Sequence, residues 1–227
     1  MTLAARLADA QGRIERAAVA ANRDATDIKL IVVTKNHPAQ LVLDLMELGC
    51  RDFGENRDQE AAPKSQEVRS VSQIAHDWHF IGQLQTNKVK SVVNYASSVH
   101  SLDRSSLLDA LAKATMDRAT PLDVFIQLNL TDDEGRGGIR QADLVGFAEK
   151  VIEKPGLNLV GVMGVAALDN QLDRDFGAIQ AASQLLQTVA PAACLISAGM
   201  SEDFETAIKY GATHLRIGSA ITGKRQY

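Results

Sequence analysis

The chain has 227 residues, of which 45% are hydrophobic and 23% are charged, as is usual for a soluble globular protein. Its formal net charge is −4, which argues against general nucleic-acid binding, because phosphate backbones require a basic protein face. Cys50 and Cys194 lie far apart and form no CxxC pair, so we expect neither a disulfide framework nor a metal site. With no signal peptide and no membrane-length apolar run, we expect a cytoplasmic protein without membrane contacts.

The predicted elements alternate along the chain. The first is an amphipathic helix with helically spaced apolar residues at Leu3, Leu7, Ile14 and Ala18. The expected strands are short apolar runs at residues 28–34, 51–55, 78–82, 98–102, 123–130, 158–165, 193–198 and 213–219. The expected helices between and after them lie at residues 38–49, 56–68, 86–96, 104–118, 141–154, 171–189 and 201–211.

This alternation predicts one α/β domain over residues 1–227. Strands that alternate with helices pair in parallel through right-handed crossovers. Eight such units fit a closed (β/α)₈ TIM barrel, here with an extra N-terminal helix. A doubly wound open sheet is the alternative.

A barrel places functional groups at the carboxyl ends of its strands and in the loops that follow. Lys35 ends the first expected strand, and Arg216 lies in the last. Side chains alternate along a strand, so if Leu30 and Val32 face the helices, Lys35 faces the barrel interior. The same alternation turns Arg216 inward. Two inward cations require an anion or an electron-rich ligand, since unpaired buried charge is costly.

Two loops at the same end have the character of a phosphate site. In "GMSED" we expect Ser201 to be a helix N-cap, where free backbone N–H groups bind anions. In "RIGSAITG", Gly218 lets the backbone approach a ligand, and Ser219 adds a hydroxyl. Phosphate sites after the seventh and eighth strands recur in this architecture. A simple cap and a simple turn are the alternatives, but beside two inward cations we favour phosphate.

Lys35 itself is either a solvated surface charge or a nucleophile. Its expected inward direction favours the nucleophile, because a neutral lysine amine attacks carbonyl carbons. An amine beside a phosphate pocket suggests a phosphorylated aldehyde or ketone. Pyridoxal 5′-phosphate (PLP), held as an internal aldimine, fits this description.

Six motifs spread over the chain carry a specific resemblance: "VTKNHP", "FGENR", "WHFIGQLQTNK", "GVMGVA", "SAGMSED" and "RIGSAITGKR". Together they resemble the pyridoxal-phosphate homeostasis protein family, single-domain relatives of the alanine racemase barrel. The resemblance implies a PLP-bearing barrel that manages PLP (vitamin B6) supply without established turnover. It also implies the cofactor-binding residues, which are Lys35 for the aldimine, Ser201, Gly218 and Ser219 for the phosphate, Arg216 for the pyridine nitrogen, and Asn56 and Met163 in the pocket lining.

The chain departs from the family pattern at Arg57, Ala198 and Thr222, which puts details of the pocket lining and loop packing in question but not the cofactor. The acidic loop 131–138 resembles a family loop whose role is open. We expect PLP as the ligand, apo PLP-dependent enzymes as recipients, and a monomer.

Three classes of function are weighed. We favour a PLP carrier without efficient turnover, and so expect no catalytic residue. A PLP-dependent enzyme such as an amino-acid racemase needs a second base, typically tyrosine, but Tyr95, Tyr210 and Tyr227 are expected in helices or at the terminus. A cofactor-free Schiff-base aldolase needs inward carboxylates, for which Glu55 is the main candidate, and ranks last.

Overall fold

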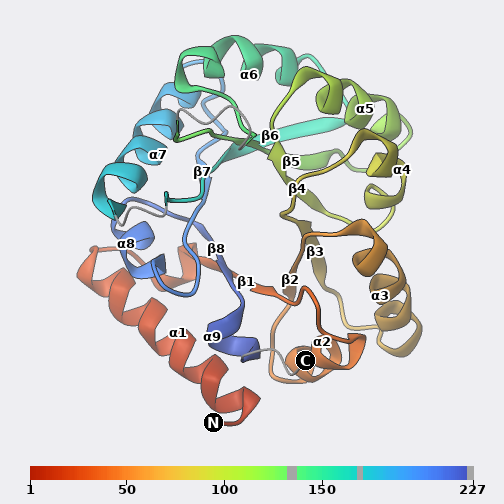
Figure 1. Ribbon diagram of the computed structural model, residues 1–227, viewed down its shortest axis with the longest axis vertical. Coiled ribbons are helices and arrows are strands. Elements are labelled where there is room, and N and C mark those ends of the chain that lie inside the picture. The colour runs from red at the N-terminus through yellow and green to blue at the C-terminus, as the bar shows by residue number, and fades with distance from the viewer. Residues whose placement is uncertain (132–136, 168–170, 224–227) are drawn as a thin grey trace.

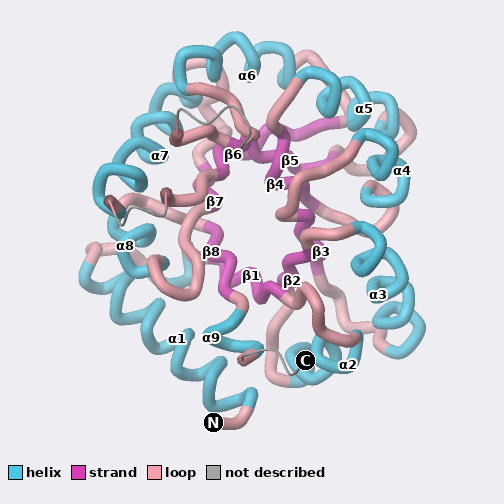
Figure 2. Tube along the Cα trace, viewed as in Figure 1, coloured by secondary structure: helices cyan, strands magenta, loops and turns pink. Residues whose placement is uncertain are grey.

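The computed structural model describes residues 1–131, 137–167 and 171–223. Within them, parallel strands form a closed barrel in the order β1 to β8, seen in Figure 2 as a magenta ring inside cyan helices. The strands are β1 Lys29–Val33, β2 Asp52–Glu55, β3 Asp77–Phe80, β4 Ser98–Leu102, β5 Leu122–Gln127, β6 Leu157–Met163, β7 Leu195–Ser197 and β8 His214–Ile217. The expected (β/α)₈ barrel is confirmed. The open sheet is wrong, because β1 pairs with β8.

Helices cover the outside of the barrel (Figure 1). They are α1 Leu3–Ala20, α2 Ala39–Glu47, α3 Asp58–Val71, α4 Val89–Val92, α5 Ser105–Thr115, α6 Leu144–Ile152, α7 Leu172–Gln187, α8 Phe204–Lys209 and α9 Ser219–Thr222, with 3₁₀ turns η1 Ala25–Asp27, η2 Thr86–Lys88 and η4 Gln141–Asp143. Thr2 caps α1, since its hydroxyl accepts from the Ala5 amide at 3.2 Å. No helix in the described ranges is long and apolar enough to cross a membrane.

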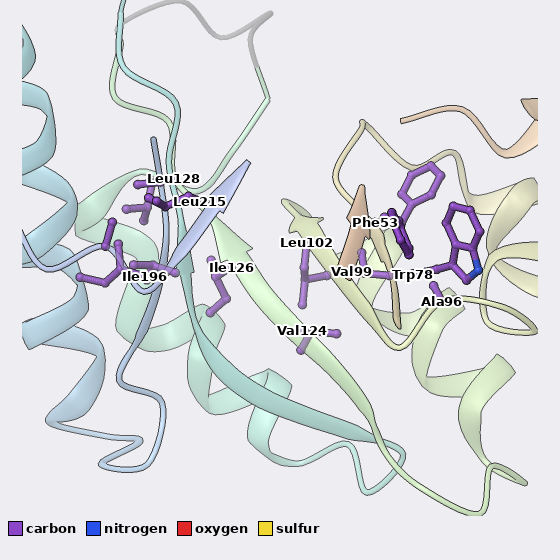
Figure 3. Packing of buried hydrophobic residues seen from close by; sticks show 14 of the residues in the cluster. Phe53, Trp78, Ala96, Val99, Leu102, Val124, Ile126, Leu128, Ile196 and Leu215 are labelled. Carbon is purple, nitrogen blue, oxygen red and sulfur yellow. The ribbon is translucent and has the colours of Figure 1, made fainter. Parts of the chain in front are cut away.

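The main apolar core lies between the barrel and its helices. In β1 and β8 every second residue joins it, as Val32 and Leu215 do. Figure 3 shows a part of this core, in which Phe53 and Trp78 pack side by side, with ring centroids 5.7 Å apart. The intervening residues, such as Ile31 and its register partner Arg216, turn to the interior. The alternation predicted for β1 and β8 is therefore present.

The sequence expectations differ from the structure at the strand ends. The eighth strand was expected over residues 213–219 but ends at Ile217, and the short helix α9 follows it. The fifth was expected to reach residue 130 but ends at Gln127. After β5 the apolar alternation continues through Leu128 and Leu130 without strand structure, whereas after β8 the chain leaves the strand at Gly218 and enters α9.

The N-terminal helix is fastened to the carboxyl end of the barrel. Arg6 on α1 donates to the carbonyls of Ile221 at 2.6 Å and Thr222 at 3.4 Å, which belong to α9. Both are far from Arg6 in sequence, so these bonds close the ring of helices. We call this contact the α1–α9 brace.

Candidate functional site at the barrel mouth

Parallel strands bring all their carboxyl ends to one rim of the barrel, which we call the mouth. The residues expected at the site lie at this end or in the loops that follow it, namely Lys35 after β1, Asn56 after β2, Met163 at the end of β6, Ser201 after β7, Arg216 in β8, and Gly218 and Ser219 after β8. The fold therefore collects residues that are nearly 190 positions apart in sequence.

Lys35 follows β1 by two residues and is half-buried. Within the described part of the chain it makes no hydrogen bond or ion pair. The preceding residue, Thr34, directs its hydroxyl to Glu55 Oε1 at 2.8 Å, on the side of helix α3. Because side chains alternate along an extended chain, Lys35 occupies the next position on the interior side. The chain then turns at Asn36, whose φ is +61°.

A buried ion pair fixes the segment that carries Lys35. Lys64 Nζ on α3 donates to Glu55 Oε1 at 2.6 Å and to the Thr34 carbonyl at 2.9 Å. The Lys64 and Glu55 side chains are only 5% and 1% exposed. Burial raises the pKa of Glu55, against the opposing effects of the Lys64 ammonium and the Thr34 hydroxyl. Glu55 is thus an anchor for this segment and not a free acid or base at the mouth.

The loops after β7 and β8 meet through serine hydroxyls. Ser219 Oγ donates to Ser201 Oγ at 3.3 Å, and the Ala220 amide donates to the same oxygen at 3.3 Å. Ser219 is exposed and Ser201 is half-buried, so both remain open to a ligand. Two hydroxyls and nearby backbone amides form a set of donors suited to an anion.

The expectation that Ser201 is a helix N-cap is wrong. Helix α8 begins at Phe204, and the residue at its N-cap is Asp203. Asp203 Oδ1 accepts from the Met200 amide at 2.5 Å and closes the turn. Ser201 is thereby left in the loop, with its hydroxyl directed to the segment after β8.

Gly218 brings that segment against the end of β1. A Cβ at this position would lie 3.4 Å from Val33 Cβ. This distance is an ordinary van der Waals contact, so Gly218 lies directly beside Val33. Lys35 follows Val33 by two positions, and the serine pair therefore adjoins the Lys35 segment.

Arg216 is the buried cation of the site, with 5% of its surface exposed. Its Nη1 donates to Ser197 Oγ at 2.6 Å, and its Nη2 donates to the Gly164 carbonyl at 2.9 Å. Burial lowers its pKa to about 10, and Asp203 opposes this, so the guanidinium remains charged at neutral pH. In the described ranges no carboxylate oxygen lies within ion-pair distance of it. The remaining N–H groups are available to an electron-rich ligand.

Met163 and Asn56 complete the set of expected residues. Met163 is 2% exposed and pairs in register with Ser197, so both side chains lie on the interior face. Asn56 Oδ1 is buried and has no hydrogen-bond partner in the described chain. The backbone of Asn56 packs closely against Gly82, since a Cβ on Gly82 would lie 2.2 Å from the Asn56 carbonyl oxygen. An orphaned amide oxygen at the mouth fits a donor from a bound ligand.

Sequence reasoning missed two polar residues on the opposite side of the mouth. Asp103 follows β4, is 8% exposed and pairs with Arg104 at 2.5 Å. A Cβ on Gly137 would lie 3.1 Å from Asp103 Oδ2 and 3.7 Å from Gln83 Nε2. Asp103 fell between an expected strand and an expected helix, where a carboxylate directly after a strand was the available signal. A cavity of about 160 Å³ adjoins this side, lined by residues 127–131, Gly137 and Val165.

The remaining sequence expectations have simple structural outcomes. Tyr95 Oη donates to Asp58 at 3.4 Å and Tyr210 Oη to Asp173 at 2.8 Å, while Tyr227 lies outside the described residues. Cys50 and Cys194 are free thiols. Within the described residues no group of side chains is placed to bind a metal ion.

The structure also places the three residues that depart from the family pattern. Arg57 is exposed at the start of α3, Ala198 is buried, and Thr222 Oγ1 donates to the Gly218 carbonyl at 3.2 Å. Most of loop 131–138 lies outside the described residues.

Comparison with known proteins places this geometry in context. A model of the family described as "Alanine racemase, N-terminal domain" matches residues 11–226. Proteins named pyridoxal phosphate homeostasis protein are similar over almost the full chain. The one from Mycobacterium bovis is 36% identical, with 97% of this chain and 92% of the relative covered. The one from Escherichia coli K12 is 35% identical, with 99% and 97% covered.

Solved structures of other proteins have a similar fold. PipY of Synechococcus elongatus PCC7942, determined with PLP bound, is 29% identical, with a TM-score of 0.85 over 98% of this chain and all of that one. Alanine racemase from Corynebacterium glutamicum is 16% identical, with a TM-score of 0.67 over 95% of this chain and 62% of that one. The second likeness concerns the fold alone.

Proposed function

Because the chain belongs to the pyridoxal phosphate homeostasis protein family, we propose that it binds PLP at the barrel mouth and buffers or delivers this cofactor. One observation carries the proposal. The Lys35 amine, which has no partner among the described residues, a pair of serine hydroxyls and a buried arginine lie at the mouth. These groups suit the aldehyde, the phosphate and the ring nitrogen of PLP, respectively.

Each residue has a defined task in this proposal. Lys35 supplies the amine for the aldehyde carbon, and the buried Lys64–Glu55 pair holds its segment in place. Ser201 and Ser219, with the backbone from Gly218 onward, donate to the phosphate oxygens. Arg216 directs a free N–H to the ring nitrogen, while Asn56 and Met163 line the pocket. PLP, when bound, supplies an electrophilic aldehyde conjugated to an electron-withdrawing ring.

The arginine favours holding the cofactor over amino-acid turnover. A guanidinium with a pKa of about 10 donates a hydrogen bond to the ring nitrogen without giving up its proton at neutral pH. With Arg216 in this position, a bound ring nitrogen would stay unprotonated and the ring would withdraw electrons less strongly, which would weaken the carbanion chemistry that PLP enzymes use. The hydroxyls of both described tyrosines are engaged with aspartates on helices α3 and α7, so neither is a free second base.

A PLP-dependent enzyme acting on amino acids is the second candidate. Its support is the fold, which is shared with alanine racemase. Incubation of the purified protein with PLP and L-alanine, followed by chiral chromatography, separates the candidates. A carrier gives no turnover beyond that of free PLP. A kcat of about 1 s⁻¹ or more would make the protein a racemase.

The Lys35 assignment is tested by covalent trapping. Borohydride reduction of the PLP-loaded protein, followed by peptide mapping, should place the pyridoxyl group on Lys35. Lys35→Ala should abolish the label, whereas the control Lys88→Ala, at the half-buried end of η2, should retain it. Recovery of the label mainly on Lys88 or Lys224 would contradict the assignment.

The phosphate assignment is tested by comparing PLP with pyridoxal, which lacks the phosphate. Ser201→Ala should weaken PLP binding by about 1.5–3 kcal/mol, as expected for a lost hydrogen bond to a charged group. Pyridoxal binding should change little. Equal losses for the two ligands would place the phosphate elsewhere.

Delivery is tested with an apo PLP-dependent enzyme as recipient. The PLP-loaded wild-type protein should restore activity to the apo-enzyme. The Lys35→Ala variant, incubated with PLP in the same way, should not. Sedimentation of the PLP-loaded protein alone should give a monomer. Transfer no faster than that from an equal concentration of free PLP would reduce the proposed role to buffering.

A further inference from the structure

Polar side chains cross the barrel interior, where branched apolar residues usually fill the layers. They come from β2, β3, β4, β7 and β8, and they form a continuous hydrogen-bonded series: Asp52, His79, Ser98, His100, Ser197 and Arg216. We call this series the interior chain. All of its members except Asp52 are buried, so each bond must be made or its loss is costly.

The Arg216 end fixes the direction of the bonds. A guanidinium has donors and no acceptor, so Ser197 Oγ accepts from Arg216 at 2.6 Å. The Ser197 hydroxyl proton is then free to donate to His100 Nδ1 at 2.8 Å. Burial keeps the pKa of His100 well below its ordinary value, and the ring is neutral. With Nδ1 accepting, the single proton of His100 lies on Nε2 and reaches Ser98 Oγ at 3.0 Å.

The Asp52 end gives the same direction. A carboxylate only accepts, so His79 Nε2 donates to Asp52 Oδ1 at 2.8 Å. The Ser98 hydroxyl, which already accepts from His100 Nε2, has its proton free to donate to His79 Nδ1 at 2.7 Å. Every proton is used once, from Arg216 to Asp52. The His100 ring is also held in place by stacking on Phe125, with ring centroids 4.3 Å apart.

We propose that the interior chain positions Arg216 for the ring nitrogen of the cofactor, with Ser197 as the direct positioning residue and His100 as the residue that orients the Ser197 hydroxyl. The inference rests on the proposed function. Ser197 on β7 and the Gly164 carbonyl after β6 hold two nitrogens of the planar guanidinium, which fixes its plane. With its plane fixed, the guanidinium points its remaining N–H groups in one direction before the ligand arrives. An arginine without these contacts would lose side-chain entropy when it bound the ligand, and its affinity would be lower.

The first test needs no ligand. Long-range ¹H–¹⁵N correlation spectra of the ¹⁵N-histidine protein report which ring nitrogen carries the proton. His100 should be the Nε2–H tautomer, and its signals are assigned by their absence in His100→Gln. A proton on Nδ1 of His100 would reverse the Ser197 bond and overturn the proposed direction.

The second test compares PLP with its 1-deaza analogue, in which C–H replaces the ring nitrogen. The wild-type protein should prefer PLP, and Ser197→Ala should reduce that preference by about tenfold or more, as for a lost bond that holds a charged group. The matched control is Ser101→Ala, since Ser101 is a buried β4 serine whose Oγ has no partner in the described chain. It should leave the preference unchanged.

The outcomes separate the two levels of the argument. Ser197→Ala that weakens PLP and its analogue equally would leave Ser197 a merely structural residue and overturn this inference alone. A wild-type protein that binds PLP without preferring it over the analogue would overturn the inference by excluding contact between Arg216 and the ring nitrogen. A wild-type protein that binds neither ligand would overturn the proposed function itself.

Discussion

At the scale of single residues, Lys64 and Glu55 matter beyond their own contact. They form a buried ion pair, and through Thr34 they hold the segment that carries Lys35. Taking two charges out of water is expensive, and only good geometry and further hydrogen bonds offset that cost. Here Lys64 has two acceptors, while Glu55 Oε2 is left without a partner in the described chain.

Lys64→Met should destabilise the fold by about 3–5 kcal/mol, because it leaves Glu55 buried without its partner. Urea unfolding followed by fluorescence of Trp78 measures the loss. The control is Lys209→Met on the surface, where the side chains of Lys209 and its partner Asp173 are 64% and 68% exposed, so its loss should cost far less than the loss of the buried pair. Similar losses in the two variants would mean that the buried pair contributes no more than a surface one.

The same residues mark how far the sequence could predict the site. Strand alternation gave the inward direction of Arg216, because that depends only on a period of two. It could not give the partners of Arg216, since Ser197 and Gly164 come from other strands and meet it only through barrel closure. Glu55 was a candidate acid, but its partner Lys64 lies on a helix whose packing no local pattern encodes.

At the scale of elements, the barrel was predictable because its signal is repeated. Each strand is a short apolar run, and in each helix apolar residues recur at helical spacing. Errors of a few residues at the ends of these elements therefore do not change the predicted fold. The errors were at the mouth, where α9 follows β8 after a single residue, Gly218. A run of Gly, Ser and Thr predicts a loop, and tertiary packing against α1 overrides that preference.

Gly161 in β6 provides a test of strand packing. The β5–β6 register shifts before Phe125, and Gly161 then pairs with Phe125 on one side and with Leu195 of β7 on the other. A Cβ at Gly161 would lie 1.8 Å from the Leu195 carbonyl oxygen. Gly161→Ala must therefore separate β6 from β7, and we expect a loss above about 3 kcal/mol or failure to fold.

Gly146 is the matched control for Gly161. It is exposed within helix α6, and a Cβ there would meet nothing within 4 Å. Gly146→Ala should stabilise the protein by about 0.5–1 kcal/mol through helix propensity and a less flexible unfolded chain. Parallel thermal melts of the two variants should show shifts of opposite sign, and melts that shift in the same direction would contradict the packing argument.

At the scale of the whole molecule, buried histidines set the acid limit of stability. Burial, assisted by the nearby positive charge of Lys29, lowers the pKa of His214 to about 3. The unfolded chain keeps a histidine pKa near 6.5. Between these values the unfolded state binds more protons than the folded state, so stability falls as pH falls through this window. His100, with a pKa also well below its ordinary value, acts in the same direction.

Unfolding free energy should therefore decrease from about pH 6.5 downward, by about 1.4 kcal/mol per pH unit for each buried histidine. Urea titrations at a series of pH values measure the slope. In His214→Asn an amide replaces the ring near its Thr213 contact and cannot titrate, so the slope should be shallower by one histidine. An unchanged slope in this variant would assign the acid sensitivity to other groups.

The α1–α9 brace links the N-terminal helix to the short helix that carries the proposed phosphate ligand Ser219. Arg6 holds the helix that contains Ser219, yet it lies ahead of the region that matches the family model, which starts at residue 11. Trimming the chain to that homologous region would keep every strand of the barrel but would remove the Arg6 contact with α9. An expression boundary at residue 11 would therefore remove Arg6 together with the core residues Leu7 and Ala10, and a tag fused near Thr2 would lie beside the contact that holds the Ser219 helix.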